Sequence, residues 1–454
     1  MSGPVTSLSF HENARAACQD ASLRRSLKKC TGIFQKKRRE AVASLPLEEL
    51  RDRASEIKMQ VLDDLSAYVD RFAASATRAG AVVHRAKDAA TARETVFHIL
   101  KDRAATKIVK SKSMVTEEIH LNEHLERRGM QVIETDLGEY IVQLAGEKPS
   151  HILAPAIHKN RQQIGKLFAE KLQVPYTDDH LDLLKIARDT LRQDFLTADA
   201  GITGANFAVA DTGSIVLVTN EGNGRMATTL PRLHIAVLTL EKIIPSLADL
   251  ATFMRLLPRS ASGQILSSYV SLITGPKKQG ESTGAEEVHI VLVDNGRSEI
   301  VAGDCREILK CIRCSACLNA CPVYATIGGH AYGSTYPGPM GIILTVLLDG
   351  MDKAYPLLDG TTLCGACDDV CPVKVPLTRM LATLRERRIT EGLTSASERA
   401  VIAGFKYAVN SPRAFDWGQR ALRRFWPGLA LLSGKKILGR LPRPADRSLR
   451  RRMP

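Results

Sequence analysis

Residues 311–322 read CIRCSACLNACP, and residues 363–372 repeat a shorter form of the pattern, LCGACDDVCP. The spacing C-x2-C-x2-C-x3-C-P is typical of cysteines that bind cubane iron–sulfur clusters. Three thiolates separated by two residues each can wrap one corner of a roughly cubic cluster, while the cysteine before the proline faces a second cluster. The two motifs therefore predict a domain that holds a pair of clusters.

The crossed pattern distributes seven cysteines over two clusters. The ligands predicted for cluster 1 are Cys311, Cys314, Cys317 and Cys371, and those predicted for cluster 2 are Cys321, Cys364 and Cys367. A complete second motif would have another cysteine three residues before Cys364, where the chain has Thr361. Cluster 2 is therefore either a [4Fe–4S] centre whose fourth ligand is not cysteine or a [3Fe–4S] centre.

Alternative uses of the cysteines fit the sequence less well. Cys305 precedes the first motif, on the wrong side of cluster 1 to complete cluster 2, so it is predicted to be a bystander. Cys18 and Cys30 are too far apart for a metal site and are predicted to be ordinary thiols. Structural zinc needs four ligands in a closed tetrahedron, often including histidine, which suits seven cysteines with two Cys-Pro endings poorly.

Paired clusters move single electrons between a donor and an acceptor. With crossed ligands, the two clusters are expected to lie on the order of 10–12 Å apart. The accompanying organic chemistry normally belongs to a flavin or another cofactor. No G-x-G-x-x-G motif follows a strand in this chain, so a flavin, if one takes part, is predicted to lie on another chain.

Upstream, residues 81–298 alternate short β-rich runs with amphipathic helices. This alternation predicts an α/β fold with a mainly parallel sheet covered on both faces. Residues 207–219, FAVADTGSIVLVT, are an exception, because two apolar runs flank Asp-Thr-Gly as in a hairpin. The sheet is therefore predicted to be mixed.

Polar residues cluster where predicted strands of this domain end. In open α/β sheets, ligands bind outside the carboxyl ends of the strands, and helix amides there favour an anion. The candidates for such a crevice are Lys110, Lys112, Thr203, Asn220, Glu221 and Asn223. The alternative is that these segments are only tight turns and helix caps. The histidines in the domain are predicted to be surface or core residues rather than ligands: His120, His124, His151, His158 and His234.

Two helical regions flank these domains. Residues 1–80 are charged and helical, and apolar residues recur there at helical spacing: Leu50, Ile57, Val61, Leu62, Leu65, Val69 and Phe72. The cluster domain is placed at residues 299–395, where a buried helix is expected between the two motifs. Residues 396–454 form a basic helical tail, whose last part, 441–454, is predicted to be disordered.

Charge is concentrated near the C-terminus. The chain has a formal net charge of +14, and residues 381–454 contain 17 lysines and arginines against 5 acidic residues. Trp417 and Trp426 lie among these cations, a combination that suits either a helical cap on the cluster domain or docking onto an anionic membrane or an acidic partner. No nucleic-acid motif is present.

Neither a secretory signal nor a transmembrane stretch is found, so a cytoplasmic protein is expected. Thiols stay reduced in that compartment, and clustered cysteines there favour metal or redox centres over disulfides.

Several longer stretches resemble one family. They include KSKSMVTEEIHLNEHLE at 110–126, GITGANFAVADTGSIVLVTNEGNGRM at 201–226 and the two cysteine motifs. The chain resembles the lactate utilisation protein B family, also called YkgF-like. The resemblance implies a LUD domain, with a fold similar to CoA-transferases and ribose-phosphate isomerases, fused to a dicluster module. It implies the same two sets of cysteine ligands. It also shows that Ser315 replaces a glycine common in the family.

The same resemblance implies the function. The chain is expected to carry electrons through two [4Fe–4S] clusters in an L-lactate dehydrogenase system, an oxidoreductase that converts L-lactate to pyruvate. Its expected partners are a cysteine-rich subunit and a second LUD-type subunit, and its tail would contact the inner face of the membrane or a partner. The alternative is that the LUD domain is a small-molecule or CoA-type binding or catalytic module, with the clusters in a regulatory or sensing role.

Overall fold

The computed structural model describes residues 7–394 and 396–432. Its contacts divide the chain into two compact units, Met1–Arg385 and Glu386–Pro454. The first unit contains both the α/β domain and the cysteine motifs, so their packing against each other is defined. The second unit is described by itself below.

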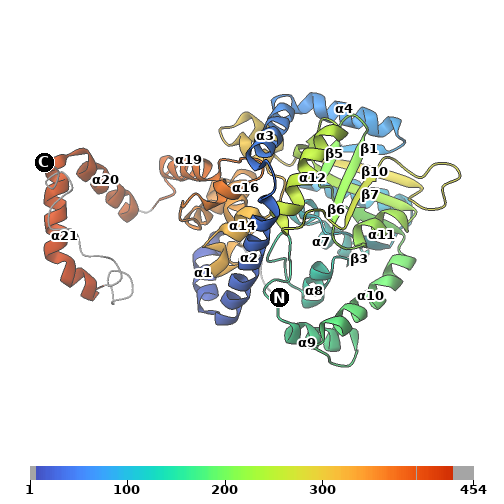
Figure 1. Cartoon of the computed structure of the whole chain (residues 1–454), viewed down its shortest axis with the longest axis horizontal. Helices are drawn as coiled ribbons and strands as arrows, with labels where there is room; N and C mark the ends of the chain where they lie inside the picture. The colour runs from blue at the N-terminus through green and yellow to red at the C-terminus, as the bar shows by residue number, and fades with distance from the viewer. Residues whose placement is uncertain (1–6, 395, 433–454) are drawn as a thin grey trace. The chain divides into compact units, whose positions relative to one another are not determined.

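The main sheet of the first unit has six strands, and every neighbouring pair is parallel. In spatial order the strands are β1 (Val82–Ala86), β10 (Glu287–Val293), β7 (Leu233–Thr239), β4 (Ala200–Thr203), β2 (Lys107–Lys110) and β3 (Gln131–Glu134). All residues of β4 and β7 are buried, as expected for central strands covered on both faces. The predicted α/β fold with a mainly parallel sheet is confirmed (Figure 1).

Helices cover both faces of this sheet. One face packs against α5 (Ala89–Asp102), α6 (Met114–Glu118) and α7 (Leu121–Glu126). The other face packs against α4 (Leu65–Arg78) and, further along the sheet, against α8 (Leu137–Ala145), α10 (His180–Thr197) and α11 (Asn223–Thr229). α9 (Arg161–Leu172) packs on α8 and α10, and α12 (Leu247–Ala261) packs against the N-terminal helices. α13 (Arg297–Ala302) follows β10.

The predicted hairpin forms, but in a second sheet. β5 (Phe207–Val209) and β6 (Ser214–Thr219) are antiparallel, and the sheet order is β8 (Ile243–Ile244), β5, β6, β9 (Tyr269–Ile273). The turn needs Gly213, whose φ is +70° and whose Cβ would lie 2.2 Å from the backbone nitrogen of Ala76. The antiparallel pairing therefore belongs to this separate sheet, because the chain leaves the parallel sheet after Thr203 and returns only at Leu233.

The N-terminal region is helical, as expected. It comprises η1 (Ser7–Ser9), α1 (Phe10–Gln19), α2 (Ala21–Val42) and α3 (Leu47–Asp63), followed by α4. All seven apolar residues predicted at helical spacing are buried. The helix is interrupted at Asp64, which caps α4 by accepting a hydrogen bond from the backbone N–H of Ala67. α2 and α3 share one hydrophobic core with the cysteine motifs, which local pattern did not indicate.

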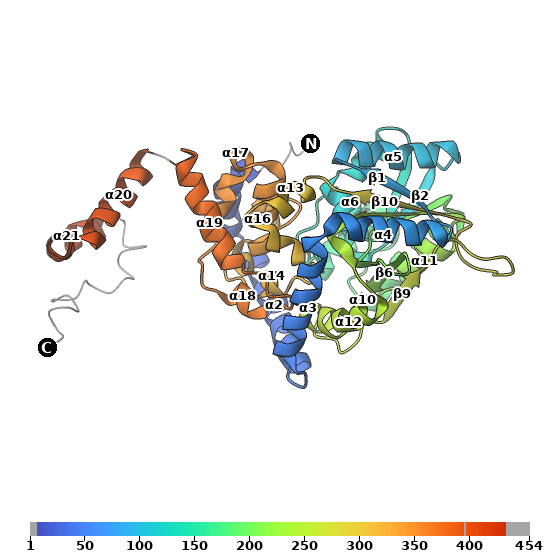
Figure 2. The same ribbon diagram turned by 90° about the horizontal axis from the view of Figure 1, so that it is seen from above.

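The cluster module is made of short helices around one buried helix. Its elements are η3 (Arg306–Lys310), α14 (Ala316–Ala320), α15 (Tyr324–Ile327), η4 (His330–Tyr332), α16 (Gly338–Asp349), α17 (Met351–Ala354), η5 (Tyr355–Asp359), α18 (Ala366–Val370) and α19 (Leu377–Thr390). Residues 338–346 of α16 are all buried, which confirms the helix expected between the motifs. α14 and α18, one from each motif, lie against each other. Figure 2 shows the module beside the sheet, with the N-terminal helices α2 and α3 lying against the module.

The second unit contains α20 (Ala396–Asn410) and α21 (Pro412–Leu432). Large apolar side chains are exposed on both helices, among them Phe405, Trp417 and Phe425. The prediction of disorder for 441–454 falls outside the described residues. In the part of the chain that the structure describes, no helix is both long and apolar enough to span a bilayer.

Candidate functional site

The first cysteine motif forms a tight loop between η3 and α14. Arg313 and Ser315 both have positive φ, at +59° and +65°, so the backbone reverses direction twice around Cys314. The backbone N–H of Arg313 donates a hydrogen bond to Cys311 Sγ at 3.4 Å. Such an amide–sulfur contact is one means by which cluster-binding loops tune a cluster.

The second motif has the same backbone. Leu363 and Gly365 have φ values of +52° and +81°, at the positions that correspond to Arg313 and Ser315. The N–H of Leu363 donates to Thr361 Oγ1 at 3.1 Å. The Thr361 hydroxyl therefore takes the place in this loop that the Cys311 sulfur takes in the first.

Four of the predicted ligands line one pocket, namely Cys311, Cys314, Cys317 and Cys371. The rest of its wall is largely apolar and includes Leu318, Met340 and Val375. None of these cysteines forms a disulfide. Burial raises the pKa of Cys314 and Cys317, and raises that of Cys371 to about 11. Thiolates in this pocket therefore need a strong positive partner.

The other three predicted ligands form a second group. Burial raises the pKa of Cys321, and the neighbouring Cys364 adds to the rise. Burial likewise raises the pKa of Cys367 to about 12, with Asp368 and Cys321 adding to it. Cys364, in contrast, is exposed, and hydrogen bonds from Thr362 and a backbone amide lower its pKa.

The donor sets suit iron–sulfur clusters. Among residues 7–394 and 396–432, no three Cys, His, Asp or Glu side chains converge on a single metal ion. A cubane binds each cysteine through a different iron, so its ligands surround a volume rather than a point. A pocket with four free thiols and an apolar wall fits such a group. The three cysteines of the second group would leave one iron of a four-iron cluster without a thiolate.

The other cysteines and the histidines have no place in these groups. Cys305 is buried in the core beneath the module, Cys30 is half-buried and Cys18 is exposed. Burial lowers the pKa of His151 and of His234 to about 4, so both are neutral core residues. His120 is exposed and His124 and His158 are half-buried.

Arginines from the N-terminal helices hold the end of the second motif. Arg51 Nε donates to the carbonyl of Cys371 at 2.8 Å, and its Nη2 donates to the carbonyl of Asp368 at 3.0 Å. Arg38 Nη2 donates to the carbonyl of Val370 at 2.9 Å. These guanidinium groups satisfy the last carbonyls of α18, and Arg38 places positive charge near Cys314 and Cys371.

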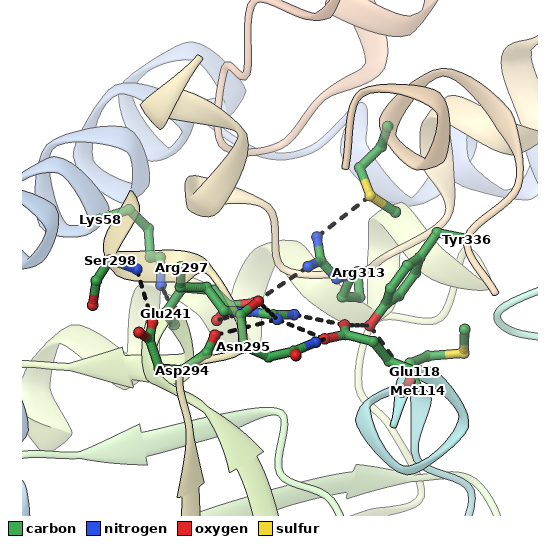
Figure 3. Close-up of polar contacts among 11 residues, drawn as sticks. Lys58, Met114, Glu118, Glu241, Asp294, Asn295, Arg297, Ser298, Arg313 and Tyr336 are labelled. Carbon is green, nitrogen blue, oxygen red and sulfur yellow. Dashed lines mark hydrogen bonds and ion pairs between the residues drawn. The ribbon is translucent and has the colours of Figure 1, made fainter. Parts of the chain in front are cut away.

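A buried charge network links the sheet to the first motif (Figure 3). Arg297, which is fully buried, makes two 2.6 Å hydrogen bonds to the Glu118 carboxylate and one of 3.3 Å to Glu241. Arg313 donates to the other oxygen of Glu241 at 3.2 Å, and Tyr336 donates to Glu118 at 2.7 Å. Burial alone would raise the pKa of Glu241, but Arg297 and Arg313 hold it at about 2.

The crevice predicted at the sheet edge is a cavity of about 390 Å³. It lies at the carboxyl ends of β2, β4 and β7, where residues 111–113, Gly204 and Thr239 contribute to its wall. Four of the six candidates line it, namely Lys112, Asn220, Glu221 and Asn223.

The other two candidates lie away from the cavity. Lys110 is buried in an ion pair with Glu134 at 2.6 Å and donates to Thr116 at 2.9 Å. Thr203 is buried and shares a 2.8 Å hydrogen bond with His234. The capping alternative holds for Ser113, whose hydroxyl accepts from the N–H of Thr116. These segments therefore include both cavity-lining residues and helix caps, and ligand binding in the cavity stays a prediction.

Comparison with known proteins identifies both domains. Residues 69–293 match the LUD domain family, and residues 307–375 match the 4Fe-4S dicluster domain family. Lactate utilization protein B of Bacillus velezensis is 46% identical over 375 residues, which cover 82% of this chain and 79% of that protein. The uncharacterized electron transport protein YkgF of Escherichia coli K12 is 44% identical over 426 residues, 93% of this chain and 89% of that protein.

The chain belongs to the lactate utilization protein B family. The family member from Bacillus subtilis is 46% identical over 82% of this chain and 78% of its own length. The match to the dicluster domain supports iron–sulfur clusters in the cysteine-rich region, residues 307–375, of the chain described here. The resemblance predicted from sequence is thereby confirmed, whereas the individual ligands stay a prediction.

Sequence reasoning missed the residues that surround the cysteines. Arg38, Arg51, Glu241 and Arg297 come from segments with no motif, and each meets its partner only through the fold. Thr361 was identified only as the place of a missing cysteine; its contact with Leu363 came from the structure.

Proposed function

We propose that this protein is an electron carrier with two [4Fe–4S] clusters in a system that oxidises L-lactate to pyruvate. The observation that carries the proposal is the grouping of the cysteines, four around one pocket and three beside each other, in a chain whose relatives are named for lactate utilization and electron transport. When bound, each cluster supplies a site that accepts and releases one electron.

The proposed ligands follow the crossed pattern. Cluster 1 is held by Cys311, Cys314, Cys317 and Cys371, and cluster 2 by Cys321, Cys364 and Cys367. Thr361 occupies the place of the missing cysteine. Its hydroxyl would supply an oxygen ligand to the fourth iron of a [4Fe–4S] centre, or that corner would be vacant in a [3Fe–4S] centre. The protein holds cluster 1 in an apolar pocket surrounded by cations and cluster 2 close to solvent at Cys364.

The proposed route of electrons uses the two clusters in succession. Oxidation of L-lactate to pyruvate releases two electrons and two protons, and two single-electron centres can take the electrons in succession. We assign the lactate chemistry to a flavin or a cysteine-rich subunit of the partner proteins, with a second LUD-type subunit completing the complex. Electrons then leave this chain towards the quinone pool of the respiratory chain.

We propose that the second unit binds a partner or a membrane surface, and that the protein is cytoplasmic. Trp417 and Phe425 are exposed on α21, a helix that also contains Arg420, Arg423 and Arg424. Cations next to exposed aromatic side chains suit contact with an acidic partner or an anionic membrane surface.

A second candidate function is favoured by the cavity at the sheet edge. A volume of about 390 Å³ is in the range of small-molecule sites. On this alternative the LUD domain binds or transforms a small molecule, and the clusters regulate it. Lactate-dependent cluster reduction in the isolated chain would favour this alternative, whereas reduction only after the partner proteins are added supports the electron carrier.

The central test is the metal content of anaerobically purified protein. We expect about eight irons per chain, or about seven if cluster 2 is [3Fe–4S], with matching sulfide and EPR signals from two centres. A colourless preparation that contains zinc and no sulfide would contradict the proposal.

A further inference from the structure

The cavity at the sheet edge reaches the first cysteine motif. Arg313 lines both this cavity and the pocket of cluster 1, and Tyr336 of the cluster module also contributes to the cavity wall. The guanidinium of Arg313 lies 5.1 Å from the centre of the Tyr336 ring. A molecule in the cavity would therefore be separated from cluster 1 by little more than one side chain.

An unpaired ammonium group lies at this end of the cavity. Lys242, between β7 and β8, lines the cavity. Within the part of the chain that the structure describes, it has neither a hydrogen bond nor an ion pair. Burial, together with the nearby Arg313, lowers the pKa of Lys242 to about 8, while Glu241 and Cys311 oppose the shift. Glu241 is already bound by Arg297 and Arg313, so it does not neutralise Lys242 as well.

Two acidic side chains, Asp136 and Glu221, also line the cavity. Lys112 lies 3.8 Å from Asp136, and Glu221 accepts a hydrogen bond from the N–H of Leu137. Burial raises the pKa of Glu221 to about 6, with Asp136 adding to the rise. Asn220 and Asn223 also line the cavity, and Leu257 and Val218 contribute apolar surface to its wall.

We propose that this cavity binds an organic anion of cofactor size, whose anionic group pairs with Lys242. The polarity of the wall sets the orientation: the anion lies towards Arg313 and cluster 1, the apolar body lies along Leu257, and hydrogen-bond donors face Asp136 and Glu221. The volume suits a ligand far larger than a three-carbon acid. The proposal concerns the LUD domain and holds whether or not the system oxidises lactate.

Binding would also act on cluster 1. An anion next to Arg313 opposes the addition of an electron to the cluster, so the ligand lowers the reduction potential of cluster 1. By linkage, reduction of cluster 1 weakens the binding of the ligand by the same factor. Binding of a small molecule in the cavity would thus depend on whether cluster 1 is oxidised or reduced.

The test uses the full-length holoprotein and two matched probes. 8-Anilinonaphthalene-1-sulfonate is an anion with an apolar body, and N-phenyl-1-naphthylamine has the same body without the sulfonate. Isothermal titration calorimetry under anaerobic conditions should show one saturable site per chain for the anion. Lys242→Met should weaken the binding of the anion at least tenfold and leave that of the neutral probe unchanged. Lys166→Met, an exposed lysine on α9, is the control and should change neither.

A second variant covers the case in which Lys242→Met fails to fold. Ser267 lines the cavity from the half-exposed segment between α12 and β9, and Ser267→Trp should obstruct it and weaken both probes. Unchanged anion binding in both variants would overturn the proposal. It would also be overturned if Lys242→Met shifts the potential of cluster 1 but does not alter anion binding, because the lysine would then serve only as a counter-ion of the cluster.

Discussion

The two cysteine motifs share a backbone and differ in their surroundings. Arg313 and Ser315 in one loop and Leu363 and Gly365 in the other have the same left-handed conformations. The loop therefore folds in the same way whether its first position is Cys311 or Thr361. The backbone conformation places the cysteines alike in both loops, and on the proposed ligation the side chain at the first position decides whether a cluster receives four thiolates or three.

The charged side chains around the two motifs differ. Arg38 and Arg313 lie near the cysteines of the cluster 1 pocket, whereas Asp368 and Asp369 belong to the second motif. Cations stabilise the additional electron of a reduced cluster and carboxylates destabilise it. We therefore expect cluster 1 to have the higher reduction potential, and electrons that enter at the exposed Cys364 side to move inwards to cluster 1.

The largest effect is expected from a change to the crossed cysteine. Cys321→Ser should remove or degrade cluster 2 and preserve cluster 1, because Cys321 serves the cluster opposite its own motif. EPR of the reduced protein and the iron content measure the loss. Cys305→Ser is the matched control and should retain both centres. Loss of cluster 1 from Cys321→Ser would show that the ligands are not crossed.

A change at Thr361 should make the two motifs alike. Thr361→Cys places a thiol where the first motif has Cys311, so cluster 2 gains a fourth thiolate and its EPR spectrum should become that of a four-cysteine [4Fe–4S] centre. The spectrum of cluster 1 should not change. Thr361→Val removes the hydroxyl without adding a ligand and serves as the control. Identical spectra for wild type and Thr361→Cys would mean that residue 361 does not face the cluster.

The difference in charge between the surroundings of the two clusters can be reduced by replacing Arg313. Arg313→Gln removes one buried cation from cluster 1, while Glu241 keeps its bond to Arg297. A cation several ångströms away contributes on the order of 100 mV, so the potential of cluster 1 should fall by about that amount. Potentiometric titration monitored by EPR resolves the two centres. A shift of cluster 2 instead would contradict the assignment of Arg313 to cluster 1.

The smallest effect is expected at Ser315, which corresponds to Gly365. A non-glycine residue in the left-handed region costs about 1 kcal/mol, so Ser315→Gly should raise stability by about that amount in chemical unfolding. The hydroxyl of Ser315 is buried at the cluster 1 pocket, and the described residues offer it no hydrogen-bond partner. If it donates to a cluster sulfur, Ser315→Gly and Ser315→Ala should lower the potential of cluster 1 equally. Only the glycine variant should gain stability.

Much of this architecture was predictable from local patterns. The spacing of Cys311, Cys314 and Cys317 predicted the loop, the alternation of apolar runs predicted the parallel sheet, and the residues from Leu50 to Phe72 predicted a buried helical face. Each pattern depends on residues within a few turns of one another, so the sequence alone is enough to indicate it. The family resemblance rests on the same stretches.

The surroundings of the clusters were decided only by the tertiary structure. Arg51 and Cys371 are 320 residues apart, and Arg297 and Glu118 are 179 apart, yet each pair forms a hydrogen bond. No periodicity encodes such pairs, because a charged side chain in a sequence looks the same whether it faces solvent or a buried partner. The cavity shared by the sheet edge and Arg313 has the same origin: its wall exists only where the two domains pack. The chain by itself predicted which cysteines bind the clusters, and the fold determined the charges and the cavity around those cysteines.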